Sequence, residues 1–324
     1  MSLFASVEIG SNTLRLLIAC VRNKKIEHIL YKRKITRLAD GVGQTGKLRD
    51  ENSASSIAVL KEFSSIISGY GVKFVSAIAT GALREASNSD MFIKRVFDNT
   101  GILIKVISGE QEAELIVKGV FSSFHDSLSI AALSSLIIDI GGGSTEWILY
   151  KDKQVVDKGS IPVGVIKLAA SFITTDPLSE AYIAELGKGI ASFLDSISSR
   201  IEHRIDKDTC LIGTAGTFTT LASIDLKLET YSREKIHLHR ISLEKLRDIR
   251  RALFALPLRE RKKIKGLEPE RADLIIPGIQ FTMNIMECFK FNELIVSDYG
   301  LLEGVLLETI GEMNEKDIQE TFKP

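Results

Sequence analysis

The sequence predicts an α/β protein made of two domains. Strand-like apolar runs alternate with helix-like stretches along the chain. One pattern, a strand entering a glycine turn and leaving as a second strand, occurs twice, near residue 10 and near residue 141. The chain has 324 residues, which is long for one core and sufficient for two.

The two copies of the pattern are alike in length and composition. In each, a short apolar run with one acidic residue enters a turn of small and polar residues, and a second apolar run follows. The runs are Leu3–Ile9, Gly10–Thr13 and Leu14–Val21 in the first copy, and Leu136–Ile140, Gly141–Thr145 and Glu146–Tyr150 in the second. We therefore expect two hairpins and two related halves.

Further elements complete the alternation. A third glycine turn, Gly213–Thr217, follows an apolar run and looks like a near-copy of the other two. Helices are expected over residues 53–68, 110–121 and 180–201. Polar residues near 124–129 mark the expected boundary, giving domains 1–124 and 125–303, with a helix over about 304–324 that returns to the first domain.

Charge and cysteine content exclude several classes of protein. Lys and Arg together number 42, as do Asp and Glu, so overall charge does not favour nucleic acid. Three separated cysteines argue against a disulfide framework. No apolar run is long enough to span a membrane, and the first residues do not resemble a signal peptide, so the cytoplasm is the expected location.

One stretch of the chain is strongly basic. Residues 233–265 hold twelve Lys and Arg against four Asp and Glu, which fits either a surface for a polyanion or a solvated helical face.

Glycine turns that follow strands are suited to phosphate. Glycine allows the backbone to approach a ligand closely, and successive N–H groups form a concave anion site. Glu8, Asp139 and Glu146 lie on or beside these turns, where they would repel phosphate. A divalent cation resolves the conflict, because Mg²⁺ binds through one or two carboxylates together with substrate phosphates.

Residues 41–47 match the start of a phosphate-binding loop of another kind, GxxxxGK. Leu48 stands where that loop requires a Ser or Thr hydroxyl for the metal, and Thr36–Asp40 is not an apolar strand leading into it. We therefore set this match aside.

Seven motifs together resemble the Ppx/GppA family of exopolyphosphatases and guanosine pentaphosphate phosphatases. They occur in the family's order over nearly the whole chain: residues 7–15 (VEIGSNTLR), 79–86 (ATGALREA), 107–115 (ISGEQEAEL), 139–146 (DIGGGSTE), 213–217 (GTAGT), 266–273 (GLEPERAD) and 297–304 (SDYGLLEG).

The resemblance implies two actin-like, ribonuclease H-like domains related by duplication, with a cleft between them. It places Glu112 at the position of the catalytic glutamate that orients or deprotonates water. Asp139 and Glu146 correspond to acidic residues near the metal and the water, and Arg84 to an arginine in the cleft. The expected metal ligands are Glu8, Asp139 and Glu146. The expected phosphate-binding residues are Ser11, Asn12, Thr13, Arg15, Gly141, Gly142, Gly143, Ser144, Thr145, Gly213, Thr214, Gly216, Thr217 and Arg271.

The chain departs from the family pattern at four positions. Glu8 stands where Asp is usual, Glu114 where Arg is common, and Tyr299 and Leu302 where arginines are frequent. The loss of three positive charges would weaken or redirect the binding of long polyanions. The chain also ends before the additional helical domain of larger relatives.

The expected function is hydrolysis of phosphoanhydrides with Mg²⁺ or another divalent cation. The substrate would be inorganic polyphosphate, guanosine pentaphosphate, or both. The alternatives are an ATP-dependent phosphotransferase or ATPase of the same superfamily, and a sensor that binds polyphosphate or a nucleotide without turnover. Homodimerisation fits a chain of this kind, but no stretch of the sequence specifies a dimer surface.

Overall fold

The computed structural model describes residues 2–22, 25–124, 134–172, 176 and 178–312. The chain divides into two compact units: unit 1 comprises the described residues of 1–125 and 299–324, and unit 2 those of 126–298. The expected boundary near 124–129 lies mostly outside the described residues, as does the end of the C-terminal helix expected to run to 324. No helix of the described ranges is both long and apolar enough to cross a bilayer.

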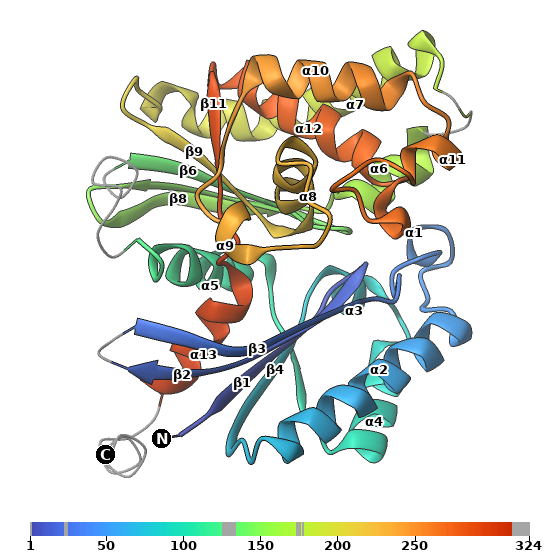
Figure 1. The fold of residues 1–324 in the computed structure, drawn as a ribbon, viewed down its shortest axis with the longest axis vertical. Helices are drawn as coiled ribbons and strands as arrows, with labels where there is room; N and C mark the ends of the chain where they lie inside the picture. Colours follow the sequence, from blue (N-terminus) through green and yellow to red (C-terminus); the bar gives the residue numbers. More distant parts are fainter. Residues whose placement is uncertain (1, 23–24, 125–133, 173–175, 177, 313–324) are drawn as a thin grey trace. The chain divides into compact units, whose positions relative to one another are not determined.

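Unit 1 is built on a five-stranded mixed sheet of order β3-β2-β1-β4-β5. Its elements are β1 (Phe4–Ile9), β2 (Thr13–Arg22), β3 (Lys25–Ile35), α1 (Val42–Thr45), α2 (Asp50–Gly69), β4 (Phe74–Ala79), α3 (Gly81–Glu85), α4 (Ser89–Thr100), β5 (Ile104–Val106), α5 (Gly109–Phe121) and α13 (Leu301–Gly311). The central strand β1 is buried along its whole length, so both faces of the sheet are covered. In Figure 1, α2 and α4 lie together against one side of this sheet.

Helix α13 packs on the other side, against β1 and α5. Phe4, Leu17, Leu302 and Leu306 form an apolar cluster there. Leu302, which stands where the resemblance leads us to expect an arginine, is therefore a core residue. Residues 42–45 form only the short helix α1, which follows turn residues and not a strand, so they lack the strand–loop–helix arrangement of a GxxxxGK loop.

Unit 2 is built on a six-stranded mixed sheet of order β10-β11-β9-β6-β7-β8. Its elements are β6 (Ser134–Ile140), β7 (Thr145–Lys151), β8 (Gln154–Ile161), α6 (Val165–Phe172), α7 (Glu180–Ile201), η1 (Glu202–Arg204), β9 (Cys210–Thr214), α8 (Ala215–Asp225), α9 (Arg233–Ile236), β10 (Arg240–Ser242), α10 (Leu243–Phe254), α11 (Leu258–Arg261), η2 (Pro269–Arg271), α12 (Ile275–Cys288) and β11 (Glu293–Val296). A large apolar core joins the sheet to α7, α8 and α12, with Trp147 and Phe281 among its largest side chains.

The two sheets share one topology. In unit 1, β1, β2 and β3 form an antiparallel meander, and β4 and β5 extend the sheet in parallel from β1. In unit 2, β6, β7 and β8 form the same meander, and β9 and β11 extend the sheet in parallel from β6. This repeat is the one that the two matching hairpins predict. The α/β class that the sequence predicts is confirmed, and the structure adds that both sheets are mixed.

Candidate active site

The unit 1 hairpin holds its glycine turn in a closed, anchored form. Gly10 N donates to Thr13 O over 3.1 Å, and a Cβ at Gly10 would lie only 2.9 Å from that oxygen, so glycine is needed here. Outside the turn, Ala39 N donates to Ser11 O, and Thr36 N donates to Asn12 O. The side chains of Ser11 and Asn12 are buried. The predicted phosphate turn is therefore a rigid, preformed element.

Glu8 and Arg15 face each other across this hairpin. The two residues are paired in the β1–β2 register, and their side chains form an ion pair. Burial raises the pKa of Glu8 above its ordinary value, Arg15 opposes this shift, and nearby Glu303 adds to it. Among the three predicted metal ligands, Glu8 therefore forms an ion pair with the arginine opposite it in its own hairpin.

Arg84 and Glu112 are brought together from two motifs. Glu112 lies in the first turn of α5, whose start is fixed by a capping box between Ser108 and Gln111. Arg84, at the end of α3, donates to Glu112 Oε2 over 2.6 Å and to Ile107 O over 3.1 Å. The Glu112 side chain is only 7% exposed. Glu112 is therefore a buried carboxylate at a helix N-terminus that is held by an arginine from another motif.

The unit 2 hairpin repeats the closure of the first. Gly141 N donates to Ser144 O over 3.0 Å, the counterpart of the bond from Gly10 to Thr13. The predicted residues Gly142 and Gly143 lie at the tip of this turn, between Gly141 and Ser144. Thr145 is fully buried, and its hydroxyl donates to the backbone carbonyl of residue 163 over 2.7 Å. Thr145 therefore anchors the hairpin through its side chain.

A pair of acidic residues flanks this second turn. Asp139 and Glu146 lie opposite each other in the β6–β7 register and are 6% and 1% exposed. Ser160, paired with Glu146 in the next strand, donates its hydroxyl to Glu146 Oε1 over 2.7 Å. Two buried carboxylates side by side repel each other unless a proton or a cation lies between them.

The third glycine turn differs from the first two. The expectation of a near-copy is wrong, because strand β9 leads directly into helix α8 at Ala215. Thr214 caps this helix in extended conformation, and Ala215 adopts a positive φ of 70°, which is strained for a residue with a Cβ. Gly216 and Thr217 thus lie in the first helical turn. Thr217 Oγ1 donates to Ile140 O over 3.1 Å, which ties α8 to the strand before the second hairpin turn.

Arg271 lies over the start of α8. A Cβ at Gly216 would be 2.3 Å from an Arg271 guanidinium nitrogen, so the glycine makes room for this side chain. Arg271 also donates from Nε to Glu268 Oε2 over 2.9 Å and is mostly buried. Gly213, the remaining predicted residue of this turn, lies against the ring of Phe218.

The predicted site residues therefore form two groups. Unit 1 holds Glu8, Ser11, Asn12, Thr13, Arg15, Arg84 and Glu112, and unit 2 holds Asp139, Gly141–Thr145, Glu146, Gly213, Thr214, Gly216, Thr217 and Arg271. Of the three predicted metal ligands, Asp139 and Glu146 lie together in unit 2, and Glu8 belongs to unit 1. Within the described ranges, no cluster of three or more His, Cys, Asp and Glu side chains is arranged to hold a metal ion.

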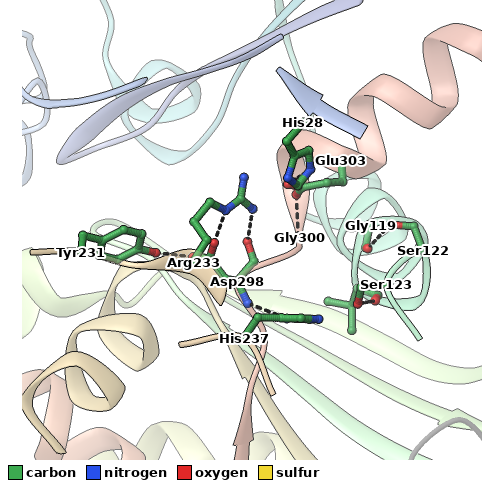
Figure 2. Close-up of polar contacts among 11 residues, drawn as sticks. His28, Gly119, Ser122, Ser123, Tyr231, Arg233, His237, Asp298, Gly300 and Glu303 are labelled. Atoms are coloured by element: carbon green, nitrogen blue, oxygen red, sulfur yellow. Dashed lines mark hydrogen bonds and ion pairs between the residues drawn. The ribbon is translucent and has the colours of Figure 1, made fainter. Parts of the chain in front are cut away.

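A partly buried polar cluster beside the third turn was not foreseen from the sequence. Arg233 Nε and Tyr231 OH both donate to the Asp298 carboxylate, and Asp298 N donates to His237 Nδ1 over 3.3 Å (Figure 2). Ser297 N, next to Asp298, donates to Gly213 O over 2.8 Å. The 297–304 motif drew attention to Asp298, but its partners lie more than 60 residues earlier and form no local pattern.

The basic stretch of residues 233–265 is largely neutralised. Nine of its twelve Lys and Arg side chains form ion pairs with carboxylates: Arg233, Arg240, Lys245, Arg247, Arg251, Arg259, Arg261, Lys263 and Lys265. Most of the acidic partners come from other parts of unit 2, such as Asp176, Asp225 and Glu287. The structure therefore favours a solvated, compensated surface over a basic surface for a polyanion.

Comparison with known proteins agrees with the motifs. Residues 17–313 match the sequence profile of the Ppx/GppA phosphatase family. A bifunctional 3-dehydroquinate synthase/phosphatase from Fusobacterium nucleatum is 35% identical over 94% of this chain, which spans only 46% of that protein. Exopolyphosphatase 2 from Mycobacterium tuberculosis is 26% identical over 95% of this chain and 98% of its own length. A guanosine-5′-triphosphate,3′-diphosphate pyrophosphatase from Pseudoalteromonas translucida is 26% identical over 98% of this chain and 61% of its own length.

Solved structures of similar length share the fold. An exopolyphosphatase from Cytophaga hutchinsonii matches with a TM-score of 0.86 and 29% identity, covering 97% of this chain and 99% of that one. The Aquifex aeolicus member of the Ppx/GppA family matches with a TM-score of 0.79 and 30% identity, also over 97% and 99%. These matches confirm the predicted actin-like α/β fold class. With motifs, profile and fold in agreement, the chain belongs to the Ppx/GppA phosphatase family.

Proposed function

We propose that this phosphatase releases terminal phosphate from inorganic polyphosphate or the 5′-phosphate from guanosine pentaphosphate. The names of its relatives, exopolyphosphatase and guanosine-5′-triphosphate,3′-diphosphate pyrophosphatase, support both substrates. The observation that carries the proposal is the buried Glu112 carboxylate, bonded to Arg84 over 2.6 Å at the start of α5. A hydrolase of this kind needs a fixed base and a nearby cation.

Glu112 would orient or deprotonate the attacking water. A carboxylate oxygen can accept a hydrogen bond from water, and Arg84 holds this carboxylate in place through Oε2. Arg84 would also meet the charge of the phosphoryl group, because a planar guanidinium can bind a carboxylate and a phosphate at the same time. The Ile107 carbonyl accepts a second hydrogen bond from Arg84 and helps to hold its side chain in place.

The two hairpin turns would hold phosphate oxygens through backbone N–H groups. The turns at Gly10–Thr13 and Gly141–Ser144 are each closed by one internal hydrogen bond, so they need no rearrangement to accept a ligand. The hydroxyls of Thr145 and Thr217 donate to backbone carbonyls. We infer that the side chains of these two threonines fix the turns, and that only their backbone groups would contact phosphate.

Asp139 and Glu146 would hold a divalent cation. The donor set fits Mg²⁺: two buried carboxylates oppose each other, and one of them is oriented by Ser160. When bound, the cation would neutralise phosphate charge and polarise the phosphoryl oxygens. Glu8 already pairs with Arg15, so it is the least suitable of the three predicted ligands.

The test is phosphate release from long-chain polyphosphate and, separately, from guanosine pentaphosphate, each with Mg²⁺ and with a chelator. Metal-dependent release from either substrate supports the proposal, and the ratio of rates names the substrate. Tight binding of both compounds without release would point to a sensor instead. Release from ATP with a phosphorylated acceptor would point to a phosphotransferase of the same superfamily.

A further inference from the structure

The chain that follows strand β8 is bonded to the backbone of the unit 2 glycine turn. Val165 N donates to Gly141 O over 3.0 Å, and Ile166 N donates to Gly142 O over the same distance. The first N–H groups of α6, which a helix leaves without internal partners, are therefore bonded to the carbonyls of the turn. We call residues 163–166 the strap.

The strap decides which way the amides of the turn face. In a planar trans peptide, the C=O and the following N–H point in opposite directions. Because the carbonyls of Gly141 and Gly142 face the strap, the N–H groups of Gly142 and Gly143 face away from it. Within the described residues, neither of these two N–H groups donates to a protein acceptor. Two successive amides that face the same way with no acceptor of their own chain are suited to bind an anion.

Unit 1 contains an equivalent of the strap. The closing bonds of the two turns align Ser11 with Gly142. Ala39 N, in the chain that follows β3, donates to Ser11 O over 2.9 Å, as the strap does to Gly142 O in unit 2. In both units, therefore, the chain that leaves the third strand of the meander holds the carbonyl of the second turn residue. The contact belongs to the repeated architecture and not to one loop alone.

Gly164 gives the strap the space for this contact. A Cβ at Gly164 would lie 2.5 Å from both the carbonyl carbon and the oxygen of Gly142, and 2.6 Å from Gly141 O. These are backbone atoms, so no side chain can move aside. The φ of Gly164 is not positive, so the close approach and not a left-handed backbone calls for glycine. A larger residue at this position must displace the turn.

We propose that Gly164 is a positioning residue for phosphate binding, because it lets the strap hold the Gly142 and Gly143 amides toward the ligand. Thr145, whose hydroxyl donates to the carbonyl of Val163, fixes the strap to strand β7. The proposal rests on the proposed function and deepens it, since it names the two amides of the second turn that contact phosphate and the segment that orients them. Gly164 lies outside the seven motifs.

The chain offers a matched control in the same unit. A Cβ at Gly189 would lie 2.4 Å from the ring of Phe172, the last residue of α6, so Gly189→Ala introduces overpacking away from the turn. Thr145→Val removes the bond to the strap with little change in shape, and Thr145→Ser keeps the hydroxyl.

The experiment is isothermal titration calorimetry of methylenediphosphonate, whose P–C–P link cannot be hydrolysed, in the presence of Mg²⁺. Gly164→Ala should weaken its binding about tenfold or more, and Gly189→Ala by less than about threefold. Thr145→Ser should bind the analogue more tightly than Thr145→Val. Affinity for Mg²⁺ alone should be unchanged in the two alanine variants, because Asp139 and Glu146 lie on strands outside the turn. Thermal melts confirm that each variant is folded, and the two threonine variants carry the test if Gly164→Ala does not fold.

Four results would overturn the proposal: no binding of the analogue by the wild type, equal weakening by Gly164→Ala and Gly189→Ala, an equal loss of Mg²⁺ and analogue affinity in Gly164→Ala, or equal binding by the two threonine variants. Its failure is separable from failure of the proposed function. If the wild type releases no phosphate but Gly164→Ala alone weakens analogue binding, the hydrolase is refuted and the strap stands. If the wild type releases phosphate and both alanine variants bind the analogue equally, the hydrolase stands and the strap is refuted.

Discussion

Glu8 shows how one carboxylate carries both a structural and an electrostatic role. It is buried, paired with Arg15, and close enough to Glu303 to feel its charge. Burial dominates and raises the pKa of Glu8 above its ordinary value of 4.5. The folded protein therefore binds this proton more tightly than the unfolded chain does.

The raised pKa of Glu8 predicts a pH-dependent stability. Because the unfolded chain releases the proton first, the contribution of Glu8 falls as pH rises from 4.5 through the higher folded pKa. Glu8→Gln removes this dependence, so the melting temperature of the variant relative to wild type should increase over that range. A difference in melting temperature that stays constant with pH would contradict the account.

At the scale of elements, glycines allow α5 and α13 to approach backbone to backbone. A Cβ at Gly304 would lie 1.9 Å from Leu115 O, and a Cβ at Gly119 would lie 1.7 Å from Gly300 O. No flexible side chain separates these contacts, so neither glycine can be replaced without moving a helix. Glu112 lies on α5, so this packing also fixes the proposed base.

Gly304→Ala should therefore destabilise the protein by about 1–3 kcal/mol or more, through overpacking. Gly311→Ala on the same helix is the matched control, because nothing lies within 4 Å of its Cβ position. That control should gain up to about 1 kcal/mol from its better helix propensity. Denaturant unfolding of both variants measures these changes in the free energy of unfolding. Equal changes in the two variants would contradict the packing argument.

The sequence predicts those elements whose signals are local. Both hairpins, with β1, β2, β6 and β7, follow from alternation of apolar runs with a glycine turn. The prediction for the third turn was wrong because a helix begins at Ala215. Ala215 has a φ of 70°, a backbone conformation that normally requires glycine, so an alanine here gives no local signal of this geometry. Arg84 and Glu112 are 28 residues apart, and only tertiary structure reveals their contact.

At the scale of the whole molecule, the same five-stranded topology is used twice, and the charge at one position differs between the copies: Arg15 in the first hairpin corresponds to Glu146 in the second. The pairing of Glu8 with Arg15 and of Asp139 with Glu146 is fixed by register, and register follows from each hairpin. Composition alone predicts neither pairing, because the overall charge is balanced and the paired residues are separated in the sequence.

The carboxylate pair predicts how metal affects global stability. Asp139→Asn relieves the repulsion with Glu146, so in a chelator the variant should melt no lower than wild type. Mg²⁺ at about 100 times its Kd should stabilise wild type by about 2.7 kcal/mol and the variant much less. A melt in which Mg²⁺ stabilises both proteins equally would place the cation elsewhere.

The central claim is that Glu112 acts on the attacking water, and one comparison tests it most directly. Glu112→Gln keeps the shape of the buried side chain, and Glu110→Gln makes the same change on the exposed side of the same helix. We expect Glu112→Gln to slow Mg²⁺-dependent phosphate release by about 10²- to 10⁴-fold and Glu110→Gln to leave it nearly unchanged. Wild-type release rates in a folded Glu112→Gln variant would contradict the account.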